Sequence, residues 1–197
     1  MLKIALTGPS GAGKGYVSAI LEKMGIRCLD CDRVVHEIYR DDDFAVAVSK
    51  ALSFDVRSKE GGIDRALLRP LVFSKKENME RLQAMVYPMV RAACIAFLEE
   101  RERSGAPAAV VDAPQLFEAG FEGDYDLIVA VTAPLEVRIL RIMERDGIGR
   151  EAALEWIGKQ LSEEEYIARS GAVLQNDGET DLTAAVLAIL SAYEVKI

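Results

Sequence analysis

Residues 8–15, Gly8-Pro9-Ser10-Gly11-Ala12-Gly13-Lys14-Gly15, decide the fold of this chain. They follow an apolar run over residues 2–6 and precede a helical pattern over residues 17–24, and this is the context that a phosphate-binding loop requires. The glycines allow successive backbone N–H groups to point at one anion. The following helix adds the positive end of its dipole, and Lys14 adds a cation. The stretch therefore predicts a nucleoside triphosphate site, against the alternative of an ordinary glycine-rich turn.

One position of the loop departs from the usual pattern. A Ser or Thr whose hydroxyl binds Mg²⁺ is expected after the lysine, but this chain has Gly15 followed by Tyr16. Two possibilities stay open: the metal is held by carboxylates and water alone, or it is held more weakly.

Composition sets the broad class. A chain of 197 residues, half of them hydrophobic, suits one compact domain with a subdomain or lid. Acidic residues outnumber basic ones 32 to 24, which argues against a nucleic-acid partner. No apolar run reaches the ~20 residues of a membrane span, and the N-terminus has no signal-peptide pattern. We therefore expect a cytoplasmic protein without a membrane partner.

The three cysteines are Cys28, Cys31 and Cys94. An odd count beside a phosphate-binding loop indicates a reducing cytoplasm. The C-x-x-C spacing of the first two is also found at zinc and redox sites, but a second ligand pair is missing and His36 is the only histidine. We expect small buried side chains at a strand end, with no zinc.

Short apolar runs predict strands at residues 2–6, 27–29, 108–111, 127–132 and 172–174. Helical patterns separate them, so the chain is predicted to form a parallel sheet with helices on both faces. Ligands of such sheets bind at the carboxyl ends of the strands. The polar groups at these ends are the loop, Asp30 with Asp32, Asp112 and Asn176.

Residues 32–103 are predicted to be almost entirely helical, which is too much for one crossover. We expect helices over 44–52, from Ile63 onward, over 75–86, and over 88–103 with Pro88 in its first turn. Asp64 is a plausible N-cap. The region is therefore predicted to be a helical subdomain inserted after the second strand. Further helices are expected over 135–145, 150–161 and 181–193.

Two carboxylates are candidates for chemistry. Asp112 ends an apolar strand, as the Mg²⁺-linked acid of phosphate-loop enzymes does, or it is a turn residue. Asp32 is placed to deprotonate an attacking hydroxyl, or it is a helix N-cap, and the two roles are compatible.

Three arginines share one face of the helix expected over 135–145. Arg138, Arg141 and Arg145 lie three and seven residues apart, so they are suited to clamping triphosphate oxygens. The alternative is a solvated face paired with Glu136 and Glu144.

Beyond the loop, a set of short motifs recurs in a recognisable order. They are residues 29–32, 62–69, 72–73, 87–90, 111–118, 141–147, 160 and 176–178. In that order and spacing they resemble the dephospho-CoA kinase family over nearly the whole chain. The resemblance implies an α/β P-loop kinase fold with a five-stranded parallel sheet flanked by helices. It also implies a core (1–31, 104–140, 170–197), a helical acceptor-binding subdomain (about 32–103) and a lid (about 141–169).

The resemblance further implies an activity and a site. The activity is transfer of the ATP γ-phosphate to the ribose 3′-hydroxyl of dephospho-CoA, with Mg²⁺, by a monomer or weak homo-oligomer. Catalytic roles fall on Asp32, Lys14 and Arg141. The residues expected to bind ATP are Gly8, Gly11, Ala12, Gly13, Lys14, Gly15, Tyr16, Arg141 and Asn176. The residues expected to bind the acceptor are Asp32, Arg65, Asp112, Leu116, Phe117 and Glu118. Asp112 is expected to hold the metal, directly or through water.

Departures from the family pattern keep two other functions open. Gly15 replaces a Ser or Thr, Tyr87 a His, and Tyr166 an Arg, and the first two bear on metal and acceptor binding. The loop reads equally well as that of a cytidylate or adenylate kinase, although the helical insertion and residues 112–118 favour dephospho-CoA kinase. A nucleotide-binding regulatory protein without catalysis is the second alternative, supported by the missing hydroxyl and opposed by Asp32 and Asp112.

Overall fold

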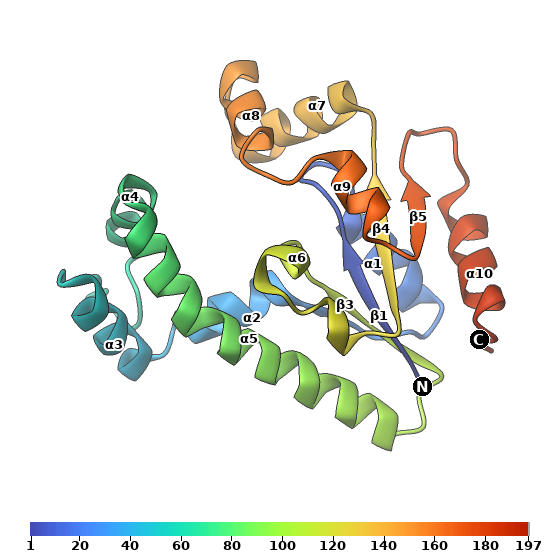
Figure 1. Ribbon diagram of the computed structural model, residues 1–197, viewed down its shortest axis with the longest axis horizontal. Helices are drawn as coiled ribbons and strands as arrows, with labels where there is room; N and C mark the ends of the chain where they lie inside the picture. The colour runs from blue at the N-terminus through green and yellow to red at the C-terminus, as the bar shows by residue number, and fades with distance from the viewer. Residues whose placement is uncertain (197) are drawn as a thin grey trace. The chain divides into compact units, whose positions relative to one another are not determined.

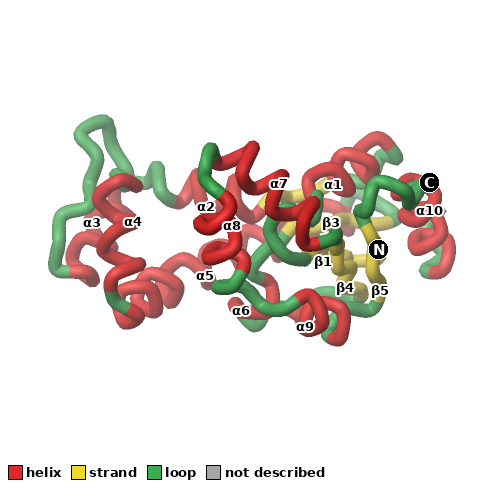
Figure 2. The backbone as a smooth tube through the Cα atoms, turned by 90° about the horizontal axis from the view of Figure 1, so that it is seen from above, coloured by secondary structure: helices red, strands yellow, loops and turns green. Residues whose placement is uncertain are grey.

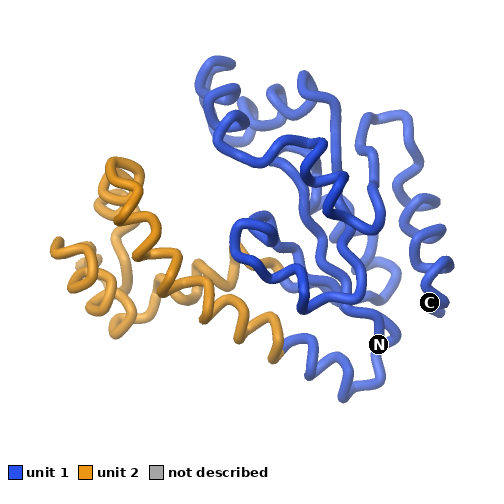
Figure 3. The backbone as a smooth tube through the Cα atoms, viewed as in Figure 1, with its two compact units in different colours: residues 1–29, 97–197 blue, residues 30–96 orange. Residues whose placement is uncertain are grey.

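The computed structural model describes residues 1–196, and the chain divides into two compact units (Figure 3). Unit 1 comprises residues 1–29 and the chain from residue 97 onward, and unit 2 comprises residues 30–96. Unit 2 falls within the region expected to form the helical subdomain, except for its first two residues. The domain boundaries themselves stay a prediction.

A five-stranded sheet forms the centre of unit 1 and confirms the predicted fold class. Its strands are β1 (Leu2–Thr7), β2 (Cys28–Asp30), β3 (Ala108–Asp112), β4 (Leu127–Thr132) and β5 (Ala172–Gln175). They lie in the order β2-β3-β1-β4-β5, and β1 pairs in parallel with both β3 and β4. Because β1 is central, the phosphate-binding loop leaves the sheet between two neighbours. Asp126 Oδ2 accepts the backbone N–H of Lys3 at 2.8 Å, which fixes the start of β1.

Helices cover the sheet of unit 1 on both faces. Helix α1 (Lys14–Lys23) and helix α10 (Leu182–Ala192) lie on one side of the strands, and α9 (Glu163–Ala168) lies on the other (Figure 2). Val17 and Leu21 of α1 and Leu190 of α10 join one buried cluster with Leu6 of β1. Full burial of such side chains contributes ~1.5–3 kcal/mol each. This packing holds the start of α1 beneath the loop.

Two helices lie beyond the carboxyl ends of the strands in unit 1 (Figure 1). They are α7 (Leu135–Asp146) and α8 (Arg150–Ile157), and with the residues up to 160 they are called here the α7–α8 segment. Ile139, Ile142 and Ala153 form its own buried cluster. Arg150 pairs with Glu136 at 2.7 Å, which joins the two helices at the surface. Unit 1 also contains α6 (Leu116–Ala119) and a 3₁₀ turn, Glu122–Asp124.

The helices of unit 2 are α2 (Cys31–Ile38), α3 (Asp42–Leu52), α4 (Arg65–Ser74) and most of α5 (Lys76–Arg103). Asp41 caps α3 by accepting the N–H of Phe44 at 2.7 Å. Asp64 caps α4 by accepting the N–H of Ala66 at 2.8 Å, as the sequence predicts.

The prediction of two helices separated near Tyr87 is wrong, because α5 runs unbroken through Pro88. Proline removes one backbone hydrogen bond and strains the preceding turn. However, buried residues recur every four positions on both sides of it, which keeps one apolar stripe continuous. These residues are Leu82, Val86, Val90, Cys94 and Leu98. Packing of the stripe outweighs the local cost of the proline.

In residues 1–196, α5 is also the single helix that is long and apolar enough to cross a membrane by length and composition. Its qualifying window has a mean hydropathy of 1.2 and is 28% buried. Splitting α5 at Pro88 hid this length from the sequence prediction. One such helix is equally typical of a globular core, so it carries no argument for a membrane role.

The chain between α8 and β5 also differs from the prediction. Helix α8 ends at Ile157 rather than near residue 161, and a separate helix, α9, follows. Ser162 and Glu165 form a capping box at the start of α9, in which each side chain accepts the backbone N–H of the other residue. The S-x-x-E pattern was visible in the sequence, but α9 has only six residues and little apolar periodicity.

Candidate active site

The glycines of the phosphate-binding loop are required by its backbone. Gly8, Gly11 and Gly13 have φ values of 133°, 78° and 97°, which residues with a Cβ rarely adopt. A Cβ on Gly8 would lie 2.2 Å from the carbonyl oxygen of Val131, and one on Gly13 would lie 2.1 Å from Nδ2 of Asn176. The loop is therefore folded tightly against β4 and the end of β5.

The loop ends where α1 begins. Gly13 is the N-cap of α1 in a left-handed conformation, and Lys14 is its first residue. The first N–H groups of a helix have no acceptor within the helix, so this end suits an anion. Lys14 Nζ donates to the carbonyl oxygen of Gly8 at 2.8 Å, which holds the ammonium over the loop. Gly15 and Tyr16 are exposed.

Two residues from distant parts of the chain meet at the loop, as expected for an ATP site. Arg141 Nη1 donates to the carbonyl oxygens of Gly11 at 3.1 Å and Ala12 at 3.3 Å. Asn176 Nδ2 donates to the carbonyl oxygen of Ala12 at 2.8 Å, and its Oδ1 accepts from Arg141 Nη2 at 3.4 Å. The geometry brings these four residues together, while their roles toward ATP stay predictions.

The three arginines expected on one face of α7 have different partners. Arg138 is buried, and its Nε donates to the carbonyl oxygen of Ser10 at 3.0 Å. Burial lowers the pKa of Arg138, although an arginine keeps its charge, and Glu163 lies 3.7 Å away as a counter-ion. Arg145 pairs with Asp146 at the surface instead. Arg138 and Arg141 therefore both contact the loop.

Asp112 ends β3 beside the start of α1. Ser18 Oγ donates to Asp112 Oδ2 at 3.4 Å, a long hydrogen bond. Ser18 therefore brings a hydroxyl of α1 to the Asp112 carboxylate, one helical turn after Gly15. A carboxylate at a strand end beside the loop fits a Mg²⁺ ion held chiefly by phosphates and water, because such sites need only one or two protein carboxylates.

Leu116 and Phe117, expected to bind the acceptor, are buried in unit 1. The Phe117 ring lies 5.9 Å from the ring of Tyr166, and the guanidinium of Arg169 lies 4.0 Å from the Phe117 centroid. Burial and the nearby Glu118 carboxylate raise the pKa of Tyr166 to about 12, so Tyr166 is neutral at physiological pH. Direct contacts of Leu116 and Phe117 with the acceptor stay a prediction.

Glu118 keeps much of its surface exposed, but its carboxyl is partly desolvated. This desolvation raises its pKa, and the Glu165 carboxylate raises it further. The cations Arg169 and Lys14 act in the opposite direction. Its electrostatic neighbours therefore include the loop lysine, while its contact with the acceptor stays a prediction.

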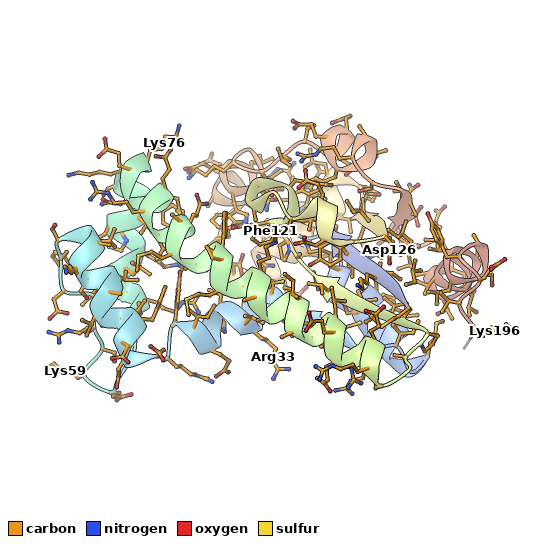
Figure 4. The ribbon with its side chains drawn as sticks, turned by 60° about the horizontal axis from the view of Figure 1, so that its bottom comes forward. Arg33, Lys59, Lys76, Phe121, Asp126 and Lys196 are labelled. Atoms are coloured by element: carbon orange, nitrogen blue, oxygen red, sulfur yellow. The ribbon has the colours of Figure 1, made fainter. Side chains whose placement is uncertain are left out.

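Asp32 and Arg65 belong to unit 2. Asp30 rather than Asp32 is the N-cap of α2, because Asp30 Oδ1 accepts the N–H groups of Asp32 at 2.8 Å and Arg33 at 3.3 Å. The reading of Asp32 as the cap is therefore wrong. Asp32 is exposed in the first turn of α2, next to Arg33, whose side chain extends outward (Figure 4). Arg65 Nη1 lies 2.7 Å from Nε2 of His36.

The two cysteines of the C-x-x-C spacing lie near different groups. Cys28 Sγ lies 3.7 Å from the carbonyl oxygen of Ser18, whereas Cys31 Sγ is buried 3.6 Å from Cys94 Sγ. Residues 1–196 contain no cluster of three or more His, Cys, Asp or Glu side chains that is arranged to hold a metal ion.

Cys28 is expected to react slowly with alkylating agents. Burial, together with the carboxylates of Glu22 and Asp112, raises the pKa of its thiol from 9.0 to about 12. Because the thiolate is the nucleophile, iodoacetamide at pH 8 should label Cys28 about 10³-fold more slowly than a free thiol. Peptide mass spectrometry on the folded protein measures this, with the urea-unfolded chain as the control. Equal rates in the folded and unfolded chains would contradict it.

Known proteins are similar to this chain over nearly its whole length. The sequence profile described as dephospho-CoA kinase matches residues 2–181. The chain belongs to the dephospho-CoA kinase family. A dephospho-CoA kinase of Rhodopseudomonas palustris is 36% identical over 190 residues, covering 96% of this chain and 94% of its own. One of Thermus thermophilus is 37% identical over 189 residues, covering 95% and 90%.

Several solved structures have a similar fold. The crystal structure of TT1252 from Thermus thermophilus has a TM-score of 0.82 at 34% identity and covers 97% of both chains. A dephospho-CoA kinase from Campylobacter jejuni has a TM-score of 0.73 at 24% identity over 98% of both chains. The shikimate kinase of Acinetobacter baumannii has a TM-score of 0.54 at 16% identity, covering 100% of this chain and 96% of its own. The last two likenesses concern the fold.

Sequence reasoning missed one group of residues in this family member. Trp156 Nε1 donates to Ser10 Oγ at 3.2 Å, and Gln160 Nε2 donates to the same oxygen at 2.8 Å. Gln160 carried part of the family resemblance, but no pattern linked it to the loop. Trp156 is the single tryptophan of the chain, and this alone did not indicate a site.

A matched pair of substitutions tests the loop geometry. Gly15→Ser should be tolerated, because no atom lies within 4 Å of the position of its Cβ, and its hydroxyl should leave Mg²⁺ affinity unchanged or raise it. Gly11→Ser should destabilise the fold by ~1–3 kcal/mol, because its φ is 78° and its Cβ would lie 2.7 Å from the carbonyl oxygen of Arg138.

Thermal melting and the Mg²⁺ dependence of activity measure both variants. A severe loss in Gly15→Ser with a mild effect of Gly11→Ser would contradict the loop geometry.

Proposed function

We propose that the chain transfers the γ-phosphate of ATP to the ribose 3′-hydroxyl of dephospho-CoA, giving coenzyme A and ADP. One observation carries the proposal: in a member of this family, the glycine loop, Lys14, Arg141 and Asn176 meet at the carboxyl edge of a parallel sheet. Ligands of open parallel sheets bind at this edge. Phosphoryl transfer needs little covalent chemistry from the protein, so positioning and charge are its main contributions.

The ATP side of the reaction falls to unit 1. Backbone N–H groups of residues 11–16 and the start of α1 receive the phosphates, and Lys14 neutralises the outer ones. Arg141 is fixed by the carbonyls of Gly11 and Ala12, so its guanidinium stands at the loop with further N–H donors for phosphate oxygens. Asn176, which follows β5, contacts the loop at the same edge of the sheet through the carbonyl oxygen of Ala12.

The family's use of ATP calls for Mg²⁺, and we assign its protein contact to Asp112. When bound, the ion would neutralise charge on the β- and γ-phosphates. Gly15 supplies no hydroxyl ligand, so the protein contact is left to the Asp112 carboxylate, directly or through water. Ser18 orients the Asp112 carboxylate through its long hydrogen bond.

On the acceptor side, we assign Asp32 to accept the proton of the 3′-hydroxyl. Support comes from its carboxylate, which is exposed at the start of α2. Asp30 caps this helix, so the Asp32 carboxylate is not needed as the cap. Arg65, Asp112, Leu116, Phe117 and Glu118 complete the proposed acceptor contacts. Arg65 is exposed, and its partner His36 stabilises its position at the start of α4.

One assay separates this function from its alternatives: ADP release from ATP and Mg²⁺ with dephospho-CoA, CMP or AMP as the acceptor. We expect turnover with dephospho-CoA to exceed turnover with either monophosphate by at least two orders of magnitude, about 3 kcal/mol in specificity. Preference for CMP or AMP would indicate a nucleoside monophosphate kinase. ATP binding without turnover on any acceptor would indicate a regulatory protein.

We also propose that the protein works in the cytoplasm as a monomer or weak homo-oligomer, without a nucleic-acid or membrane partner. The net charge of −8 and the odd number of cysteines support this environment.

A further inference from the structure

Ser10, in the phosphate-binding loop, is held by the α7–α8 segment through every polar group that it has. Its N–H donates to Gln160 Oε1 at 3.0 Å. Its hydroxyl accepts from Gln160 Nε2 at 2.8 Å and from Trp156 Nε1 at 3.2 Å. Its carbonyl oxygen accepts from Arg138 Nε at 3.0 Å. These four residues are called here the Ser10 cluster.

A second observation shows how closely the two elements approach. A Cβ placed on Gly11 would lie 2.7 Å from the carbonyl oxygen and 2.9 Å from the Cα of Arg138. The backbone of α7 therefore packs directly on the turn of the loop. Arg141, one turn further along α7, reaches the carbonyls of Gly11 and Ala12 from this position.

The two helices of the α7–α8 segment are held together by contacts of their own. Ile139, Ile142 and Ala153 form its own buried cluster, and the Glu136–Arg150 pair joins its helices. Arg138, Trp156 and Gln160 come from its two helices and the turn that follows α8. Docking through the Ser10 cluster therefore sets the place of Arg141 as well.

We propose that Ser10, Trp156 and Gln160 are positioning residues that couple docking of the α7–α8 segment to ATP binding at the loop. The inference rests on the proposed function, because ATP is the ligand. Docking fixes the loop in the conformation that directs its N–H groups at phosphate, and it delivers Arg141. Because coupling between two such equilibria is reciprocal, bound ATP stabilises docking to the same degree.

Kinetics of Ser10→Ala provide the main test. The change removes the two side-chain bonds and keeps both backbone bonds, so KM for ATP should rise about 5- to 50-fold, as expected for two hydrogen bonds. KM for dephospho-CoA should stay within roughly twofold of wild type, because a loss confined to the ATP side is what ATP-linked docking implies. Ser10→Thr keeps the hydroxyl and should restore KM for ATP.

Two further variants sharpen the test. Trp156→Phe keeps an aromatic ring but removes the N–H donor, so KM for ATP should rise about 2- to 10-fold for one lost bond. Ser191→Ala makes the same change as Ser10→Ala at an exposed position of α10, and it should behave as wild type.

Fluorescence reports docking independently of turnover. Trp156 is the single tryptophan, so emission at 295 nm excitation comes from the Ser10 cluster alone. Adding a non-hydrolysable ATP analogue to the wild-type protein should change this emission with the affinity that calorimetry measures. In Ser10→Ala the change should fall by at least about half, because the indole has lost its partner.

The outcomes separate the two proposals. If calorimetry shows that the wild type does not bind the ATP analogue, the proposed function is wrong and this inference falls with it. If ATP binds and Ser10→Ala has the wild-type KM for ATP and the wild-type Trp156 response, the inference alone is wrong. A lower melting temperature of Ser10→Ala with unchanged KM for ATP would assign the cluster a structural role only and would also overturn it.

Discussion

Lys14→Ala is expected to reduce phosphoryl transfer by at least ~10²-fold and to weaken ATP binding, because it removes the cation held over the phosphate-binding loop. The ammonium sits on the Gly8 carbonyl at the mouth of the loop, where it would face the charge that develops on the transferred phosphate. Steady-state kinetics and calorimetry with an ATP analogue measure the two effects separately.

Lys23→Ala is the matched control for this variant. Lys23 lies exposed in the last turn of the same helix, so its loss changes net charge equally but not the site. We expect wild-type kinetics from the control. Near-normal activity and ATP affinity in Lys14→Ala would remove the phosphate-binding assignment.

Asp32→Asn is expected to lower kcat by ~10²–10⁴-fold, the usual contribution of a positioned general base. ATP affinity and melting temperature should stay close to wild type, because Asp30 and not Asp32 caps α2. The asparagine keeps the size of the side chain and removes the group that accepts the proton. Turnover with dephospho-CoA and thermal melting are measured on the same preparation.

Asp43→Asn provides a close control. Asp43 is the second residue of α3 as Asp32 is the second residue of α2, and both side chains are exposed. Loss of the favourable charge at a helix N-terminus costs both variants the same ~0.3–1 kcal/mol. Equal kcat values for the two variants would take Asp32 out of the mechanism.

Local patterns predicted most of the fold. The run of buried residues in β4 matches the predicted strand at both ends, because an apolar run bounded by polar residues has few alternatives in a parallel sheet. Pro88 misled the prediction, because a local rule for proline was applied without weighing the four-residue spacing of buried side chains through α5. Helix α9 was missed because six residues carry little periodicity.

Residues of the candidate site could be predicted where a short sequence motif determines their role. Gly8, Gly11 and Gly13 take positive φ values because no other residue fits the turn, and the spacing of the motif records this. The Trp156–Ser10 bond joins residues 146 positions apart, and no pattern in a single sequence reports such a pair. The cap of α2 depends on the extended backbone of Asp30, which the run Asp-Cys-Asp does not reveal.

Phosphorus NMR of the reaction products tests the central claim most directly. The protein is incubated with ATP, Mg²⁺ and dephospho-CoA, and the position of the new phosphate is determined. The account predicts one ADP for each new phosphate monoester, located on the ribose 3′-oxygen of coenzyme A. ADP without a phosphorylated acceptor, or phosphate at any other position, would contradict it.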